Sequence, residues 1–383
     1  MSILTHSPAI VRDGLVLCLD AGAVRSYPGT GPELVSNGNF ESSFTNYWVI
    51  RPAQDSGNQV LTQDSSIVKS GTYSAKIVVG GSNPNYDGFR GDSSGHFTLT
   101  NGKRYLLSFD VYPVNDTGID AYIVAGSTYC GTNVTGLTQG AWNNVELFID
   151  VTATSSSSFV EFQTGSLWGD GTWYFDNVSV REVLWNDLSG NFNNGTLANA
   201  PAFSAESGAG GTKSFDFDGS SDYIDCGTGF NHTSNLTCEM WAKIDTGSGV
   251  MFAQWHNASN KRKWYIGMNA TNVFFYIDSA GSGTFTSVNG GAYPTDGEWH
   301  HYALVYTPSS SLVAYVDGES VGSDTSSVAA SIYSSTDVNI YIGRSEAGEY
   351  WDGKIAIARM YTKSLTATEI QRNYRAQKGR FGR

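Results

Sequence analysis

Residues 26–42 read SYPGTGPELVSNGNFES, and they join the end of one pattern to the start of another. The preceding stretch, RDGLVLCLDAG (residues 12–22), predicts a strand that ends in a Gly-containing turn. The following stretch, ELVSNGNFE (residues 33–41), reads as the start of a new domain. A chain that has only just begun one domain therefore begins another, which indicates that the first domain is interrupted.

The composition predicts an all-β protein with two or three domains. Of the 383 residues, 40% are hydrophobic and 13% are aromatic, whereas only 15% are charged. Aromatic and β-branched runs alternate with Gly, Ser, Thr and Asn, as is typical of strands joined by tight turns. The net charge of −13 argues against a nucleic-acid partner, because such binding needs a basic patch.

The sequence predicts neither a membrane span nor a secretory signal. No apolar run approaches the roughly 20 residues that a membrane-spanning helix needs, so we expect no membrane insertion. The N-terminal stretch MSILTHSPAIVRDG lacks a basic region followed by an apolar run, which favours synthesis in the host cytoplasm without secretion. The four cysteines have no CxxC spacing, and we expect them to be free thiols: Cys18, Cys130, Cys226 and Cys238.

From about residue 184 onward, short alternating segments follow one another between turn residues. Examples are LTCEMWAKID (residues 236–245) and EWHHYALVYTP (residues 298–308), while SLVAYVDGESVG (residues 311–322) is a hairpin with Asp-Gly at its tip. Many short strands with regular turn signals predict an antiparallel sandwich or jelly roll. Near the C-terminus, Thr366 and Glu369 form a capping box, which predicts a short helix over about residues 367–378.

Residues 33–183 also read as strands. In GTWYFDNVSVREV (residues 171–183), the aromatic and β-branched residues alternate as they do in a half-buried strand. This block of about 150 residues is long enough to form a complete sandwich of its own. The sequence therefore predicts two β-sandwiches and one C-terminal helix.

The outer parts of the sequence resemble the laminin-G-like domains, which are jelly rolls of the concanavalin A type, in the form common in virion proteins of tailed phages. The stretches that carry the resemblance are GLVLCLDAG, SYPG, WNDLSGNFNNGTL, FDFDGSSDYIDCG, EWHHYALVY, AYVDGE, YIGR, WDGKIAIARMYTKSLTATEIQRNY and KGRFG. In that family, SYPGTG and W-x-D-L-S-G lie a few residues apart. Here about 150 residues separate them.

The separating block resembles a different family, the carbohydrate-binding modules that accompany xylanases and endoglucanases. Its matching stretches are NGNFES, SGTYSAKI, GKRYLLSFDVY, WNNVELFIDV and WYFDNVSV. We therefore expect residues 1–31 and 184–383 to form one discontinuous jelly roll, with residues 32–183 inserted in an early loop as a second sandwich. Loop tips tolerate such insertions.

The sequence predicts no catalytic site. Glucanases on the jelly-roll fold carry alternating carboxylates near the pattern E-x-D-x-x-E, and no such run occurs here. Asp216, Asp218 and Asp222 surround an Asp-Gly turn, which indicates a hairpin tip. The neighbouring His300 and His301 should face opposite sides of their strand. We therefore expect a protein that is not an enzyme.

The resemblance to carbohydrate-binding modules implies a structural Ca²⁺ that ties the first strand of the inserted domain to the last. The motif places its carboxylate ligands at Glu41 and Asp176, with backbone carbonyls near Asn39 and Lys69. Hard anionic oxygens with carbonyls suit Ca²⁺. The alternative is that both carboxylates simply bind backbone groups and water.

Sugar binding needs aromatic faces on which C–H groups stack, with polar groups nearby for the hydroxyls. In the inserted domain, the candidates are Tyr86, Phe89, Tyr112, Tyr122, Tyr129 and Trp168. Three other tryptophans match core positions of the family: Trp48, Trp142 and Trp173. The alternative for each candidate is a packing role, and a purely architectural module is the alternative for the set.

These features favour a non-enzymatic protein of the virion surface, either decorating the capsid or forming a fibre or appendage, with a cell-surface glycan as partner. We expect a homo-oligomer that contacts other virion proteins. A basic tail with one aromatic anchor would dock on the particle, unless it only keeps the protein soluble: Lys378, Arg380, Phe381 and Arg383. The alternatives are a fibre-borne glycan hydrolase or depolymerase and a bacterial surface adhesin.

Overall fold

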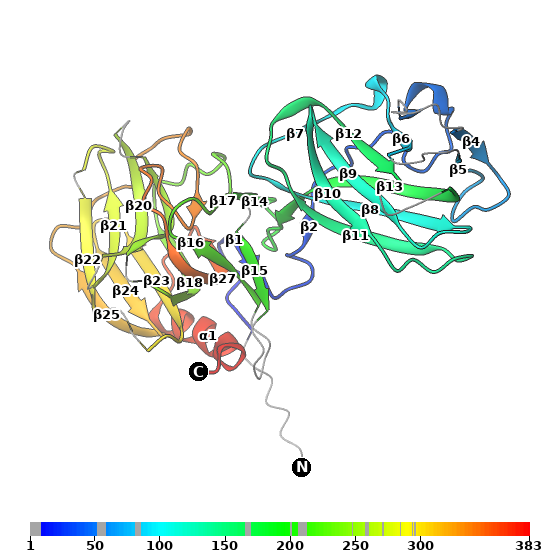
Figure 1. Cartoon of the computed structure of the whole chain (residues 1–383). Coiled ribbons are helices and arrows are strands. Elements are labelled where there is room, and N and C mark those ends of the chain that lie inside the picture. Colours follow the sequence, from blue (N-terminus) through cyan, green and yellow to red (C-terminus); the bar gives the residue numbers. More distant parts are fainter. Residues whose placement is uncertain are drawn as a thin grey trace, which may run out of the picture. The chain divides into compact units, whose positions relative to one another are not determined.

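The structure is a computed structural model in which two compact units can be described, each with its own β-sheets. It describes residues 9–51, 59–80, 86–164, 170–199, 201–205, 213–246, 248–256, 260–269, 272–283, 285–292, 294 and 296–383. The outer unit combines Met1–Gly29 with Leu184–Arg383, and the inserted unit is Thr30–Val183. The predicted all-β class, with antiparallel sheets and one short C-terminal helix, is confirmed (Figure 1).

Two antiparallel sheets build the inserted unit. The first has the order β10 (Thr128–Val134), β9 (Ile119–Ala125), β12 (Ser155–Gln163), β6 (Gly88–Gly91) and β3 (Trp48–Ile50), with β7 (Phe97–Leu99) also paired to β12. The second contains β11 (Asn143–Asp150), β8 (Arg104–Pro113), β13 (Gly171–Trp185), β5 (Ser74–Val79) and β4 (Val60–Asp64). Short 3-10 helices lie at Phe44–Asn46 and Ser93–Gly95.

Aromatic rings from both sheets fill the core of the inserted unit. Phe89 of β6 and Phe162 of β12 pack with Phe175 of β13, with ring centroids 4.5–5.2 Å apart. Trp48 and Trp173 are buried, as predicted. Phe89 is fully buried in this cluster, so its ring face is not accessible to a sugar, and the prediction that it binds one is wrong.

The outer unit also contains two antiparallel sheets. The first, called sheet A, has the order β15 (Ala202–Ala205), β16 (Lys213–Asp218), β27 (Asp352–Tyr361), β18 (Leu236–Ile244), β23 (Trp299–Thr307), β24 (Ser311–Val316) and β25 (Glu319–Asp324), and β1 (Leu15–Asp20) also pairs with β27. The second, called sheet B, has the order β14 (Gly195–Ala198), β17 (Tyr223–Asp225), β26 (Tyr341–Ile342), β19 (Gly249–His256), β20 (Lys261–Met268), β21 (Asn272–Asp278) and β22 (Phe285–Ala292).

Strand β13 continues from the inserted unit into the outer unit. Its last two residues, Leu184 and Trp185, pair with Thr196 and Gly195 of β14. Near the other junction, the short strand β2 (Gly29–Thr30) also pairs with β13.

The C-terminal helix α1 spans Ala367–Gln377, close to the predicted 367–378, and a 3-10 helix follows at Lys378–Phe381. Its N-terminus has the predicted capping box. The Thr366 side chain accepts from the Glu369 N–H, and the Glu369 carboxylate accepts from the Thr366 N–H. The helix buries Ile370 and Asn373 against the unit that it covers.

A buried charge pair lies between sheet A and helix α1. Glu239 of β18 stands opposite Arg359 of β27, and Arg359 Nη1 lies 2.6 Å from Glu239 Oε1. Asn373 Nδ2 donates to both Glu239 oxygens at 3.1 Å, and His301 Nε2 lies 3.5 Å from Glu239 Oε2. Asn373 Oδ1 in turn accepts from the Val11 N–H at 2.7 Å. This network joins the N-terminal segment, two central strands and the helix.

The C-terminal tail packs on its own unit, which corrects the docking prediction. The Phe381 ring stacks on Trp241 with centroids 4.1 Å apart and is almost fully buried, so it is not a free anchor for a partner. Arg380 Nη1 forms an ion pair with Asp20 Oδ1 at 2.6 Å. Of the four predicted docking residues, Lys378 is exposed, Arg380 and Arg383 are half-buried, and Phe381 is buried.

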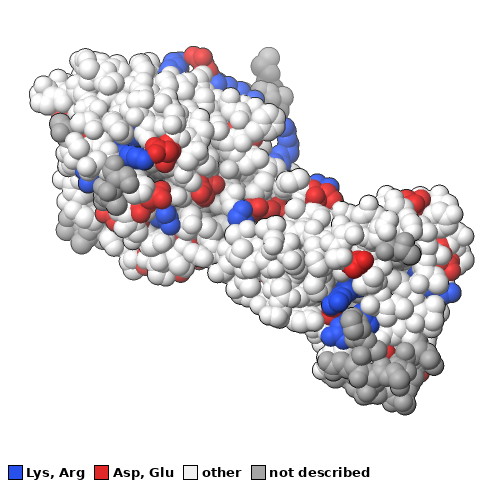
Figure 2. Space-filling view, turned by 90° about the horizontal axis from the view of Figure 1, so that it is seen from above, with Lys and Arg blue, Asp and Glu red and all other residues white. Residues whose placement is uncertain are grey.

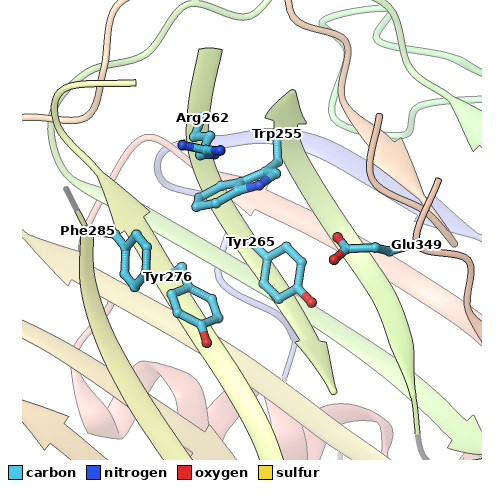
Figure 3. Close-up of a pocket in the computed structure, with 6 residues that line it drawn as sticks. All are labelled: Trp255, Arg262, Tyr265, Tyr276, Phe285 and Glu349. Carbon is cyan, nitrogen blue, oxygen red and sulfur yellow. The ribbon is translucent and has the colours of Figure 1, made fainter. Parts of the chain in front are cut away.

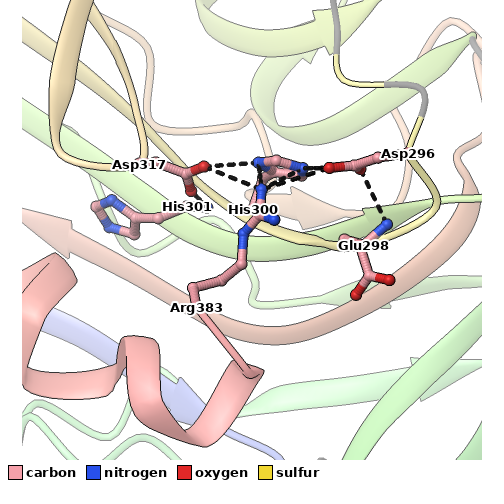
Figure 4. A network of polar contacts seen from close by, with 6 residues as sticks. All are labelled: Asp296, Glu298, His300, His301, Asp317 and Arg383. Carbon is pink, nitrogen blue, oxygen red and sulfur yellow. Dashed lines mark hydrogen bonds and ion pairs between the residues drawn. The ribbon is translucent and has the colours of Figure 1, made fainter.

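Arg383 also returns to the outer unit, as Figure 4 shows. His300 Nδ1 lies 2.7 Å from Asp317 Oδ2, and its Nε2 lies 3.0 Å from Asp296 Oδ1. Arg383 Nη2 lies 3.3 Å from the same Asp317 oxygen. Burial alone would lower the pKa of His300, but the two carboxylates outweigh it and raise the pKa. His301 faces Glu239 instead, so the prediction that the two histidines face opposite sides is confirmed.

The surface has few charges. On the face in Figure 2, acidic and basic side chains occur in small, often adjacent groups among much uncharged surface. Among the residues that the structure describes, no helix is long and apolar enough to cross a membrane. All four cysteines are free and buried, as predicted.

We predict that Glu239→Gln destabilises the outer unit by about 3–5 kcal/mol at pH 7, because Arg359 would lose its buried partner. Burial alone would raise the pKa of Glu239, but His301 and Arg359 together lower it to about 2. Because the pKa of Glu239 is lower in the folded than in the unfolded protein, ionised Glu239 stabilises the fold at pH values above its unfolded pKa of roughly 4.3. This contribution is lost as the pH falls from there toward 2.

Urea unfolding of the wild type and the variant, at pH 7 and pH 3, measures this effect. The difference in the free energy of unfolding between the wild type and Glu239→Gln should be smaller at pH 3 than at pH 7. The exposed Glu298→Gln provides the matched control. An unfolding midpoint of Glu239→Gln equal to that of the wild type at pH 7 would contradict the prediction.

Candidate functional site

Three of the predicted aromatic residues come together in the inserted unit. Tyr86, Tyr122 and Tyr129 line a hollow of about 340 Å³ with Arg51 and Gln163. Tyr122 lies on β9, Tyr129 on β10 and Gln163 on β12, while Arg51 directly follows β3 and Tyr86 precedes β6. The hollow therefore collects side chains from five neighbouring segments of one sheet.

Strand alternation directs these side chains away from the core. Ala121 and Ile123 are fully buried, so Tyr122 between them points to the opposite face of the sheet. Tyr122 stands opposite Gly131 on β10 and Glu161 on β12. A Cβ atom at Gly131 would come within 2.8 Å of Tyr122 Cδ1, so the glycine leaves room for the ring.

The three tyrosines of the hollow are partly exposed, and two of them pack edge to face. The rings of Tyr122 and Tyr129 are nearly perpendicular, at 87°, with centroids 5.5 Å apart. Tyr129 is 47% exposed and Tyr86 is 40% exposed. Tyr86 has φ of +66°, which a residue with a bulky side chain seldom adopts, and its N–H donates to the Thr164 carbonyl. A strained backbone thus holds this ring at the rim.

Polar groups lie beneath and beside the rings. Arg51 Nε forms an ion pair with the fully buried Glu161 Oε1 at 2.7 Å, and Arg51 Nη1 donates to the Tyr86 carbonyl. Burial alone would lower the pKa of Arg51, but Glu161, with a smaller contribution from Tyr129, outweighs burial and raises the pKa. Gln163 Oε1 is buried and has no hydrogen-bond partner within the ranges that the structure describes. The amide of Gln163 therefore keeps one unused acceptor oxygen beside the hollow.

This arrangement suits a ligand with an apolar face and hydroxyl groups at its edge. Exposed aromatic rings offer surface for C–H groups, and the guanidinium and amide groups supply donors and acceptors. Among the described residues that line the hollow there is no carboxylate, and Glu161 below them is paired with Arg51.

The other predicted sugar ligands do not join this hollow. Tyr112 lies on β8 of the second sheet, where its ring packs edge-on against Trp142 and Tyr174. Trp142 is half-buried rather than fully buried as predicted. Trp168 lies outside the described residues. Phe89, as noted, belongs to the core.

Sequence reasoning missed Arg51, Glu161 and Gln163. The spacing of Glu161 and Gln163, two apart in SSSSFVEFQ (Ser155–Gln163), would have placed them on one face of a strand. No local signal connects that strand with Arg51, because the contact depends on the order of strands in the sheet.

The predicted calcium ligands Glu41 and Asp176 both hold one loop of the inserted unit. Asp176 Oδ2 accepts from the N–H groups of residues 69 and 70, at 3.1 and 2.9 Å. Glu41 Oε1 accepts from the N–H groups of residues 72 and 73, at 2.8 and 2.9 Å. Lys69 therefore contacts Asp176 through its N–H and not through its carbonyl.

Two buried carboxylates meet at this loop. Asp176 stands opposite Asp110 in the pairing of β13 with β8. Burial raises the pKa of Asp176, and the charge of Asp110 adds to the effect. Asn39 Oδ1 accepts weakly from the Glu41 N–H, at 3.5 Å. No group of three or more His, Cys, Asp or Glu gathers here as a metal site in the described ranges, so Ca²⁺ stays a prediction.

Comparison with solved structures gives likenesses of low identity. Domain 4 of the extracellular arabinanase AbnA from Geobacillus stearothermophilus, solved with arabinotriose, is 18% identical, with a TM-score of 0.38 over 49% of this chain and 90% of that one. The binding domain of Paraclostridial Mosquitocidal Protein 1 is 14% identical, with a TM-score of 0.38; the match covers 49% of this chain and 48% of that one. The receptor-binding domain of botulinum neurotoxin type G is 13% identical, with a TM-score of 0.39; the match covers 50% of this chain and 48% of that one.

This chain thus spans about half the length of the two toxin binding domains. At these TM-scores the likenesses carry no argument about function. No curated protein matches the chain.

Two family models match separate parts of the sequence. Residues 218–371 match the concanavalin A-like lectin/glucanases superfamily, and this range lies in the outer unit. Residues 32–171 match the carbohydrate binding domain family, and this range lies in the inserted unit. The chain therefore contains a laminin-G-type, concanavalin A-like domain and a carbohydrate-binding module.

Proposed function

We propose that the protein binds a glycan through the hollow formed by Arg51, Tyr86, Tyr122, Tyr129 and Gln163. The observation that carries the proposal is the convergence of three partly exposed tyrosines on the outer face of one sheet, above a buried and unpaired amide oxygen. The match of residues 32–171 to the carbohydrate binding domain family supports it.

In this proposal the residues divide into two roles. The exposed rings of Tyr86 and Tyr129 cover the apolar face of a sugar ring, while Gln163 and Arg51 hydrogen-bond its hydroxyls. The protein binds and does not cleave the glycan. This part of the proposal is supported by the lack of a lining carboxylate among the residues described around the hollow. A hydrolase would need a second, separate site with two carboxyl groups.

We predict that Tyr129→Ala and Tyr122→Ala each weaken glycan binding at least about tenfold, or about 1.4 kcal/mol, because each removes an aromatic wall of the hollow. A glycan array identifies the ligand, and calorimetry with that ligand measures the loss. Phe148→Ala is the matched control, since Phe148 is an exposed ring on the other sheet of the inserted unit. Equal binding by both tyrosine variants and the wild type would rule out this hollow.

We further propose that the protein belongs to the surface of a tailed-phage virion, as capsid decoration or as part of a fibre, and forms a homo-oligomer there. The support is the resemblance of the outer sequence to such virion proteins. The packed tail leaves the exposed Lys378 as the remaining docking candidate among the predicted four.

This proposal predicts that the chain co-purifies with phage particles through a density gradient and a high-salt wash. Mass spectrometry of the particle band should detect it in many copies, and gold-labelled antibodies should place it on the head, neck or tail. A chain found in the lysate but absent from washed particles would contradict the virion role and leave the glycan site unaffected.

We also propose a structural Ca²⁺ at Glu41 and Asp176. A cation there would offset the charge that Asp110 and Asp176 bring together in a buried place. Carboxylate oxygens are the ligands that Ca²⁺ prefers. In this role the two carboxylates would hold the ion as well as the loop of residues 69–73.

Chelation should therefore lower the melting temperature of the inserted unit by about 5–10 °C relative to calcium at a hundredfold excess over its Kd. Glu41→Gln should remove this difference, whereas Glu146→Gln, an exposed carboxylate on β11, should preserve it. Scanning calorimetry at matched ionic strength is the measurement. A wild-type melt that ignores the chelator would show that backbone donors alone satisfy Glu41 and Asp176.

A further inference from the structure

Lys263, on strand β20 of the outer unit, is a completely buried lysine. Among the residues that the structure describes, no carboxylate pairs with its amine. Its neighbours on the strand have other places: Arg262 lies over the Trp255 ring and Tyr265 packs against the same ring, as Figure 3 shows, while Trp264 is buried in the core. Neither this aromatic cluster nor the core therefore explains why a lysine stands at position 263.

The amine of Lys263 ends at the side chain of Asn231. Lys263 Nζ donates to Asn231 Oδ1 at 2.9 Å and to the Ser335 carbonyl at 3.3 Å. The same Asn231 oxygen accepts from the Ser335 N–H at 3.0 Å. Asn231 Nδ2 donates to Ser334 Oγ at 3.1 Å. Both polar atoms of the carboxamide are thus held in place beside the amine.

The two loops around this contact are fastened to sheet B by a buried amide. Gln254 is fully buried on β19, which pairs with β20. Its Nε2 donates to the Phe230 carbonyl at 2.7 Å and to the Val338 carbonyl at 2.9 Å. One loop therefore holds Asn231 at a fixed place relative to β20, and the other holds the groups that bind its carboxamide.

This arrangement places a nucleophile beside an electrophilic carbon. Burial without a countercharge disfavours the ammonium form and lowers the pKa of Lys263 to about 8, so a neutral fraction exists at pH 7. A neutral lysine amine is a nucleophile. The Ser335 N–H at Asn231 Oδ1 would stabilise the negative charge that develops on this oxygen when the amine attacks the carboxamide carbon.

We propose that Lys263 and Asn231 join in an intramolecular isopeptide bond. The Lys263 nitrogen forms a bond to Asn231 Cγ, and the bond between Cγ and Nδ2 breaks. One proton passes from the attacking nitrogen to the departing nitrogen, which leaves as ammonia, and the other hydrogen stays on the new amide. Ser334 Oγ lies within hydrogen-bond reach of the departing nitrogen. No oxidation occurs, and no co-reactant is consumed.

Such a bond would join the two sheets of the outer unit. Lys263 lies on β20 of sheet B, whereas Asn231 lies in the segment that leads from β17 into β18, a central strand of sheet A. A covalent link between residues 32 apart restricts the unfolded chain and therefore stabilises the folded unit. This proposal concerns the outer unit alone and does not depend on glycan binding.

Mass spectrometry of the wild-type full chain tests the proposal. We expect the denatured chain to weigh less than its sequence by one ammonia, about 17 Da. The four cysteines are free, so no disulfide changes the mass. In a tryptic digest, residues 214–243, which contain Asn231, should appear joined to a peptide that begins at Lys263, because trypsin does not cleave after an acylated lysine.

Lys263→Met and Asn231→Ala should each abolish the linked peptide, whereas Lys261→Met, on the same strand, should keep it. The linked peptide decides rather than the mass alone, because an Asn-Gly sequence such as Asn37-Gly38 also loses ammonia when it forms a succinimide. The wild-type digest is informative whether or not the variants fold. The proposal is overturned if that digest contains no linked peptide after prolonged incubation at a pH above the pKa of the amine.

Discussion

The outer unit depends on the contact between Glu239 and Arg359. Both side chains are almost completely buried, and such a pair is tolerated only when further hydrogen bonds satisfy its remaining atoms. Asn373 of helix α1 supplies two of them, and its own oxygen then binds the N-terminal segment at Val11. One electrostatic requirement thus fixes the centre of sheet A, the position of helix α1 and the path of the segment around Val11.

Both units place aromatic side chains on the outer face of a sheet by the same physical route. In a strand of a sandwich, one set of side chains enters the core, and the alternate set is free to serve another purpose. In the inserted unit that set includes Tyr122, and in the outer unit it includes Tyr265 and Tyr276. These aromatic clusters arise where several neighbouring strands use this freedom for aromatic residues.

Much of the fold could be predicted because its signals are local. Alternation identifies strands, and the capping box at Thr366 identifies the start of the helix. The site was predicted less completely, since the residues that join the tyrosines across strands, such as Arg51 and Gln163, are set by strand order. Phe89 and Phe381 were assigned to surfaces and lie buried, because the burial of a ring depends on residues distant in the chain.

The discontinuous outer unit has a consequence for the order of folding during synthesis. Strand β1 must wait for its partner β27, and Glu239 must wait for Arg359 and Asn373, which are translated last among these elements. The inserted unit is complete at Val183, long before them. It can therefore fold on the ribosome before strand β27 and helix α1 of the outer unit have been synthesised.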